Sequence, residues 1–177
     1  IRSVWVNSDL AQPGEITSVT DLLQPKWKGR IVAGDPRVGG FGSTATVMRL
    51  KHGDDFLRRL YKDQAVVVGR EQRQMMEQLT RGQYAVGINV VNDQLILEFL
   101  AAGVGKNLKH VDLEDADYIS STGNIVFLFN KPPHPNAAKL FLNWFLTKEG
   151  QVAWVEVTKE NSRRVDVPAG NPDYQST

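Results

Sequence analysis

Short apolar runs alternate with segments of helical apolar spacing along most of the chain. The runs are bounded by Gly, Pro or polar residues and are typical of strands. Two of them, 31–33 and 65–68, are apolar throughout, so we expect both to be buried. The predicted strands of this first part are 3–6, 31–33, 65–68, 84–88 and 108–111.

Apolar side chains at helical spacing separate these strands. The pattern predicts two helices within 45–61, interrupted at His52 and Gly53, and further helices over 71–80 and 93–102. A short helix over 18–23 begins with Ser18 and carries Asp21 three residues later, as in a capping box. Strands and helices in alternation predict an α/β fold, with a mixed, mostly parallel sheet flanked by helices.

The pattern changes after Asp112. A polar, acidic segment over 114–122 is followed by a strongly apolar predicted strand, 125–129. Asn136 is placed to cap a helix over 137–147 that has an aromatic side, and Gly150 is placed to end it. We therefore divide the chain into two parts, 1–112 and 113–177.

Composition narrows the function. The chain has 177 residues, of which 41% are hydrophobic and 23% charged, as in a globular protein. Its net charge of +1 provides no basic field for nucleic acid, and no apolar run has the length of a membrane helix. There is no cysteine, and because the chain opens at Ile1 without Met, we expect a fragment or a processed product.

A glycine-rich loop follows the strand at 31–33. Gly39, Gly40 and Gly42 permit a sharp turn, and Ser43 or Thr44 can cap a helix that begins near Ala45. The first amides of such a helix lack intrahelical partners and suit an anion. The alternative is a plain strand-to-helix turn in which Ser43 only caps the helix.

Other candidate contacts follow from topology, because ligands of α/β sheets collect beyond the carboxyl ends of strands. Arg70 follows a strand and can hold a carboxylate or phosphonate at two points; the alternative is a solvated arginine. Asp93 is explained equally well as a helix cap. The predicted ligand-binding residues are Gly42, Ser43, Thr44, Arg70, Asn89, Asp93, Ser121 and Thr122.

No catalytic set, cofactor motif or metal site is predicted. His52, His110 and His134 lie far apart in sequence, without metal-ligand spacing to one another or to a carboxylate, and are expected to be exposed. No Gly-x-Ser-x-Gly elbow is present. The sequence therefore predicts a protein that is not an enzyme.

Four segments together resemble one family. They are 20–31 (TDLLQPKWKGRI), the Asp35-Pro36 loop, 81–87 (RGQYAVG) and 133–151 (PHPNAAKLFLNWFLTKEGQ). The family is the extracellular solute-binding proteins of ABC importers, in the branch around the ferric-iron-binding proteins. The resemblance runs from about Asn7 to Val157, and the last segment is its most specific part.

The resemblance implies a type 2 periplasmic-binding fold, in which two α/β jaws close on a solute. Residues 1–112 would be the second jaw. Residues 113–177 would be the crossover strand, hinge and C-terminal helices that return toward a first domain expected upstream of Ile1. The protein would be periplasmic or otherwise extracytoplasmic, with or without a lipid anchor and without membrane insertion, and would deliver its solute to a membrane permease.

The resemblance also bears on the ligand. The loop at Gly42-Ser43-Thr44 matches the family's anion site, whereas iron-binding members carry a tyrosine pair where this chain has Val90, Val91 and Asn92. A small organic or inorganic anion, with or without a metal, is therefore favoured over iron held by tyrosines. Two alternatives stay open: a ligand-sensing domain of a regulator or receptor, and an enzyme that acts on phosphorylated substrates near Ser43.

Overall fold

The computed structural model describes residues 3–113, 115–117 and 126–170, without the side chain of Asp93. The chain forms two compact units, which comprise residues 1–119 and 120–177. Each unit is described by itself below.

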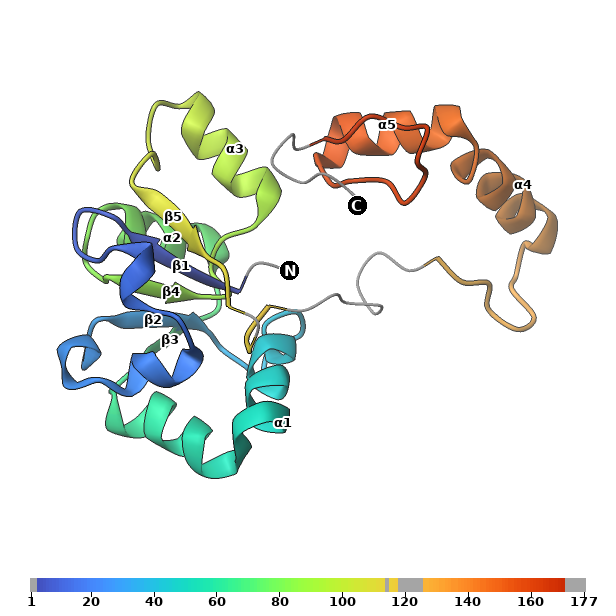
Figure 1. Cartoon of the computed structure of the whole chain (residues 1–177). Helices are drawn as coiled ribbons and strands as arrows, with labels where there is room; N and C mark the ends of the chain where they lie inside the picture. The colour runs from blue at the N-terminus through green and yellow to red at the C-terminus, as the bar shows by residue number, and fades with distance from the viewer. Residues whose placement is uncertain (1–2, 114, 118–125, 171–177) are drawn as a thin grey trace. The chain divides into compact units, whose positions relative to one another are not determined.

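A five-stranded sheet organises the first unit (Figure 1). Its order is β3-β2-β4-β1-β5, and β2 pairs in parallel with both β3 and β4. Strand β1 runs antiparallel to both of its neighbours, β4 and β5. The predicted mixed, mostly parallel sheet is thus confirmed. The strands are β1 (Val4–Asn7), β2 (Ile31–Gly34), β3 (Val67–Gly69), β4 (Val86–Ile88) and β5 (Leu108–Val111).

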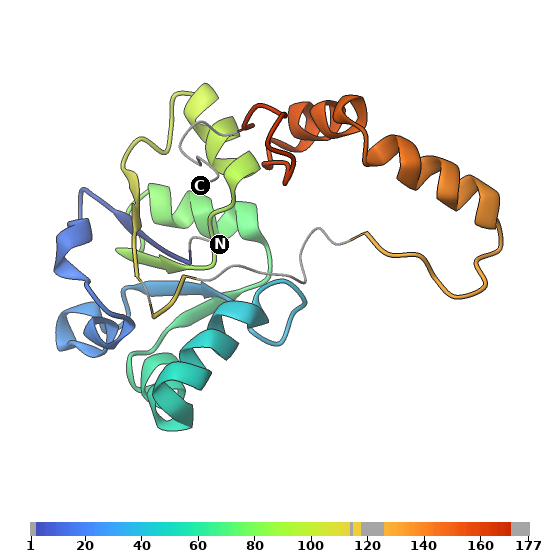
Figure 2. The same ribbon diagram turned by 45° about the vertical axis from the view of Figure 1, so that its right-hand side comes forward.

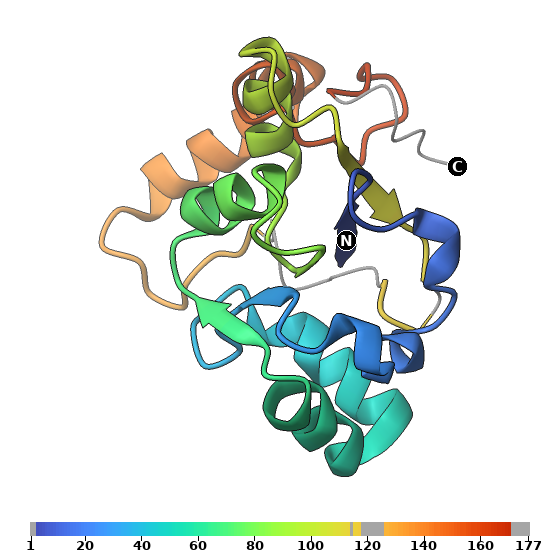
Figure 3. The same ribbon diagram turned by 90° about the vertical axis from the view of Figure 1, so that its left-hand side faces the viewer.

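Helices cover both faces of this sheet, and two hydrophobic clusters fill the spaces between (Figures 1 and 3). Side chains alternate along each strand, so Val4 and Val6 join one cluster and Trp5 joins the other. The first cluster lies under α1 (Gly42–Arg58), and the second under α2 (Gln72–Thr80) and α3 (Asp93–Ala101).

The predicted pair of helices within 45–61 is one helical run with a kink. Gly53 has φ 83° and ψ 176°, which interrupts α1, and the run continues into a π-helical turn, η4 (Arg59–Asp63). A glycine adopts this backbone without the Cβ clash that other residues meet. The predicted interruption is therefore confirmed at Gly53, although the helices are not separated by a loop.

Three 3-10 turns connect β1 to β2: η1 (Pro13–Glu15), η2 (Val19–Leu23) and η3 (Pro25–Trp27). The predicted capping box is confirmed in η2, where Ser18 and Asp21 satisfy each other's backbone amides. The side chain of Trp27 is buried among the first hydrophobic cluster.

The strand predicted over 65–68 is present as β3, but its predicted start and its predicted burial are wrong. Ala65 adopts a left-handed backbone with φ 52°, and β3 begins two residues later at the edge of the sheet. Val67 and Val68 are 44% and 42% exposed. An apolar run marks a strand but does not reveal whether that strand lies inside the sheet or at its edge.

The second unit contains two helices, α4 (Pro135–Phe145) and α5 (Lys148–Thr158), which Figure 2 shows end to end. Three predictions here are wrong. Residues 126–129 are not a strand. Helix α4 begins at Pro135, and its N-cap residue is His134, which makes no side-chain cap, so Asn136 does not cap it. Gly150 does not end α4; Thr147 caps α5, and Gly150 lies in its first turn, against Phe145.

Candidate functional site

The carboxyl ends of β2, β3 and β4 meet at one edge of the sheet, because these strands are parallel. Asp35, Arg70 and Asn89 each follow one of those strands. Strand β1 runs the opposite way, so Ser3, which precedes it, reaches the same edge. The backbone connects these ends directly: the Asp35 amide donates to Gly69 (2.8 Å) and the Asn89 amide donates to Ser3 (2.7 Å).

Helix α1 begins at this edge without a side-chain cap. Its N-cap residue is Phe41, so the prediction that Ser43 or Thr44 caps the helix is wrong. Gly42 fits because a Cβ there would lie 2.7 Å from the Pro36 carbonyl oxygen. The amides of Gly42, Ser43 and Thr44 lie in the first turn, where a helix offers no carbonyl partner and its dipole is positive.

The two hydroxyl groups of this turn have different surroundings. Thr44 is buried, and its Oγ1 lies 3.3 Å from Ser3 Oγ, within hydrogen-bond distance. Ser43 is partly exposed. Of these two hydroxyl groups, that of Ser43 is the more accessible.

Asp35 forms an ion-pair cluster with two arginines. Arg37 donates from Nε (2.8 Å) and Nη2 (2.9 Å) to the buried Asp35 carboxylate, and Arg70 donates from Nε (3.2 Å). The Arg37 hydrogen bonds are the main reason that the pKa of Asp35 lies far below its usual value, so the carboxylate is charged at neutral pH. The Arg70 side chain is itself mostly exposed.

Asn89 connects the end of β4 to the glycine-rich loop. Its backbone is left-handed with φ 55°, a conformation that asparagine tolerates better than most residues. Its Nδ2 donates to the carbonyl oxygens of Gly40 and Phe41, each at 3.3 Å. The structure thus brings the predicted residue Asn89 to the loop before α1, where it holds the backbone of that loop.

The remaining predicted contacts are not brought to this cluster by the described part of the structure. Asp93 begins α3, but Asn92 is the cap of that helix, accepting from the Leu95 amide at 2.7 Å. Ser121 and Thr122 lie outside the described residues. Val90 and Val91, in the place of the tyrosine pair, are buried in the hydrophobic cluster under α2 and α3.

Sequence reasoning missed two histidine–carboxylate pairs, and the expectation of exposed histidines is wrong for both. His52 Nε2 lies 3.1 Å from Asp115 Oδ2, with hydrogen-bond geometry. The side chain of His110 is 9% exposed, and its two ring nitrogens lie near Asp112 and Asp117. The spacing of His110 and Asp112, alternate residues at a strand end, was the available sequence signal.

Comparison with solved structures finds the same fold in proteins of low sequence identity. Iron-bound HitA from Pseudomonas aeruginosa has a TM-score of 0.67 and 16% identity, over 98% of this chain and 56% of that chain. AfuA from Actinobacillus pleuropneumoniae, with fructose-6-phosphate bound, has a TM-score of 0.53 and 24% identity, over 86% and 49%. A two-component system protein that mediates signal transduction has 0.63 and 18%, over 97% and 58%.

These similarities define the fold class as that of type 2 periplasmic binding proteins, and this chain spans about half the length of the similar structures. The family model for bacterial extracellular solute-binding proteins matches residues 3–156, and the chain belongs to that family. The predicted resemblance is therefore confirmed. A search among curated proteins finds no match. Within the described residues, no helix is both long and apolar enough to cross a membrane.

Proposed function

We propose that the protein is the solute-binding component of an ABC importer and that it captures a small anionic solute for a membrane permease. The observation that carries the proposal is the start of α1, where the first helical turn has no side-chain cap and opens beside a glycine-rich loop. Uncapped amides at the positive end of a helix dipole favour an anion. In keeping with the extracellular solute-binding family, the proposed role is to bind the solute without making or breaking a bond in it.

Arg70 is the proposed second contact. Arg37 uses both Nε and Nη2 on Asp35, whereas Arg70 reaches Asp35 through Nε alone at 3.2 Å. The side chain of Arg70 is 68% exposed, and this residue follows β3 at the same edge as the start of α1. A guanidinium already oriented by a carboxylate can receive a second oxyanion with little further ordering. Ser43 supplies an accessible hydroxyl.

We further propose that residues 1–112 are the second jaw of a two-jaw protein and that 113–177 return through a hinge to a first domain. Exposed apolar residues of the second unit support this, since exposed apolar surface of this kind marks contact with another surface. An extracytoplasmic location follows from the family. The exposed residues include Phe127, Phe129, Leu140, Phe141 and Leu146.

The test is calorimetric titration with phosphate, sulfate, a hexose phosphate, small carboxylates and ferric citrate. It uses this chain and a longer product that includes the adjoining coding sequence. We expect one anion class to bind the longer product, with affinity reduced about tenfold or more in R70Q, because a charged hydrogen bond contributes roughly 1.5–3 kcal/mol. R37Q is the matched control and should have a smaller effect. Absence of anion binding, or equal losses in both variants, would refute the assigned site.

A ligand-sensing domain is the second candidate function. The similarity to a two-component system protein favours it, although that similarity concerns the fold alone. The adjoining sequence separates the two candidates. A signal peptide and a second α/β lobe support transport, and a DNA-binding or transmembrane signalling segment supports sensing.

A further inference from the structure

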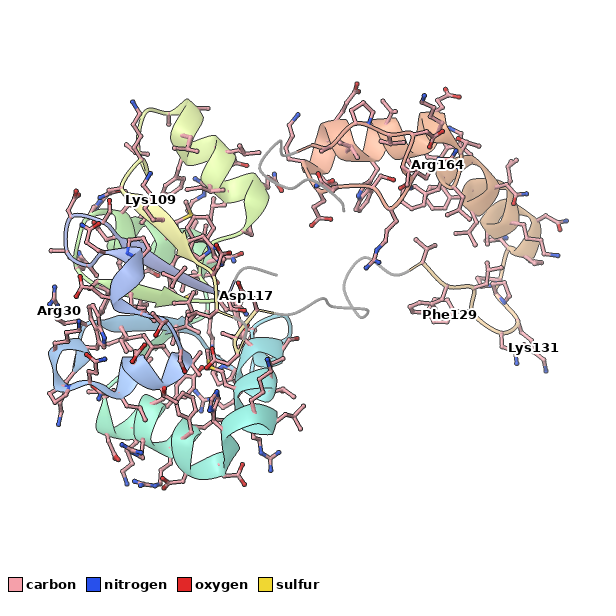
Figure 4. The ribbon with its side chains drawn as sticks, viewed as in Figure 1. Arg30, Lys109, Asp117, Phe129, Lys131 and Arg164 are labelled. Carbon is pink, nitrogen blue, oxygen red and sulfur yellow. The ribbon has the colours of Figure 1, made fainter. Side chains whose placement is uncertain are left out.

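A second polar site lies at the end of β5, on the face covered by α2 and α3. His110 pairs with Trp5 across the sheet, and the two rings meet edge to face at 5.5 Å. The Asp117 amide donates to the Leu113 carbonyl oxygen at 2.8 Å, and the Asp117 side chain lies beside the His110 ring. Figure 4 labels Asp117 near the segment that follows β5 and the start of α1.

The two ring nitrogens of His110 have different surroundings. Nδ1 lies 3.0 Å from Oδ1 of Asp112, whose side chain is almost fully exposed, and Nε2 lies 3.1 Å from Asp117 Oδ2. Among the described residues, the buried Nε2 has no hydrogen-bond partner, although the Asp117 oxygen is within 3.1 Å of it. The distance alone therefore does not make a hydrogen bond.

The His52 and Asp115 pair indicates that the direction of the carboxylate oxygen, and not its distance, decides whether a hydrogen bond forms. There, too, Nε2 and a carboxylate oxygen lie 3.1 Å apart, but the geometry is that of a hydrogen bond. At His110, a proton on Nδ1 directed to Asp112 would leave Nε2 with a lone pair beside a carboxylate oxygen. Two such acceptors repel each other unless a proton or a metal ion lies between them.

A metal ion accounts for the observed geometry. An ion in line with the Nε2 lone pair sits about 2.0–2.1 Å from the nitrogen, and a carboxylate ligand sits about 2.0–2.2 Å from the ion. With a ligand angle near 90–110°, the oxygen then lies roughly 3 Å from Nε2 and away from the N–H direction. Asp112 would act as the carboxylate that orients a metal-bound histidine through its other nitrogen.

Ser3, the residue before β1, holds the Asp117 carboxylate in position. The Ser3 amide donates to its Oδ1 at 2.7 Å, which leaves Oδ2 directed to His110. The Asp117 side chain remains 25% exposed, which gives an ion access.

We propose that His110 Nε2 and Asp117 Oδ2 bind a divalent first-row transition-metal ion, with Asp112 orienting the imidazole and exchangeable oxygen ligands completing the coordination. Imidazole with carboxylate suits such ions better than Mg²⁺ or Ca²⁺, which prefer oxygen ligands alone. The site is separate from the anion contacts at Arg70, although Ser3 connects it to α1 through Thr44.

The test uses untagged protein and two probes, Co²⁺ by visible absorption and Zn²⁺ by calorimetry. We expect wild type to bind both ions with one-to-one stoichiometry. H110Q should remove the Co²⁺ spectrum, and D117N, which keeps an acceptor for the Ser3 amide, should weaken binding at least as much. D112N should weaken binding by about 10–100-fold, the usual effect of an orienting carboxylate.

H52Q is the matched control, because it changes a histidine–carboxylate pair at the same distance, and it should bind as wild type does. R70Q should also leave metal binding unchanged, so that failure of the anion proposal and failure of this one are distinguishable. Circular dichroism confirms that each variant is folded. Wild type that binds Co²⁺ no better than H110Q would overturn the site.

Discussion

The two units of the chain use hydrophobic residues in opposite ways. The first unit buries its apolar side chains on both faces of a sheet, in two clusters closed by helices. In the second, Val155 is the one buried hydrophobic side chain among the described residues 126–170, and large apolar side chains such as Leu140 are exposed. Similar helical periodicity can therefore mark a helix whose apolar side is covered within its own unit or a helix whose apolar side is exposed there.

The largest expected difference between the two units is in the cost of truncating one leucine in each. Leu79 on α2 is fully buried, whereas Leu140 on α4 is 72% exposed. L79A should lower the free energy of unfolding by about 2–5 kcal/mol through lost burial and a cavity. L140A should change it by less than about 0.5 kcal/mol, as at ordinary surface positions. Urea unfolding measures both.

The same two substitutions can also be measured in a longer product that includes the adjoining coding sequence. If a further lobe covers α4, L140A should there approach the cost of a buried leucine. An equally small effect in the longer product would contradict the proposal that the second unit packs against another domain.

The burial of Tyr61 in the first unit can be tested through the pH dependence of stability at alkaline pH. Burial, with a contribution from the Asp35 charge, raises the pKa of Tyr61 from 10.0 to about 12. The unfolded state then loses its phenol proton first, so stability should fall between pH 10 and 12, by at most roughly 2–3 kcal/mol. Y61F should remove this part of the pH dependence in denaturant titrations. An unchanged profile in Y61F would show that the phenol is solvated.

Gly150 is an exception to the difference between the two units, because this position of the second unit is tightly packed. A Cβ at Gly150 would lie 2.9 Å from the Phe145 Cα, whereas nothing lies within 4 Å of a Cβ at Gly39. G150A should therefore lower the thermal stability of the α4–α5 pair by about 1–3 kcal/mol, as overpacking does. G39A serves as the control. If G150A is tolerated as well as G39A, the α4–α5 corner is looser than the structure indicates.

Helix caps should give the smallest effects, of similar size in the two units. Asn92 caps α3 through the Leu95 amide, and Thr147 caps α5 through the Gly150 amide. N92A and T147A should each cost about 1 kcal/mol, because each leaves one amide without its acceptor. Hydrogen exchange of the first turn of each helix measures the effect locally. Stabilisation by either substitution would contradict the assigned cap.

Much of the first unit could be predicted from sequence, because its patterns are local. The core side of α2 and the interruption at Gly53 follow from spacing and from glycine alone. The edge position of β3 could not be predicted, since a short apolar run does not reveal how many neighbours a strand has. The apolar segment 126–129 was misread as a strand for a related reason, because strand pairing depends on a partner that the segment itself does not contain.

The candidate site was predictable in part. The glycine loop predicted a helix from near Ala45, whereas α1 begins at Gly42, because Phe41 as its N-cap has no polar signature. Arg70 lies beside Asp35 because β2 pairs in parallel with β3, and neither segment by itself predicts that pairing. His110 and Asp117 come together only through the turn that follows β5, so their proximity is a property of the fold.

The position of β1 within the sheet bears on the order in which the first unit folds. Val4 pairs with Ile88 on one side and Val111 on the other, so both neighbours of this strand come from segments distant in sequence. Pairings so distant in sequence slow folding. We therefore expect the residues around Val4 to remain unpaired until a late step of folding.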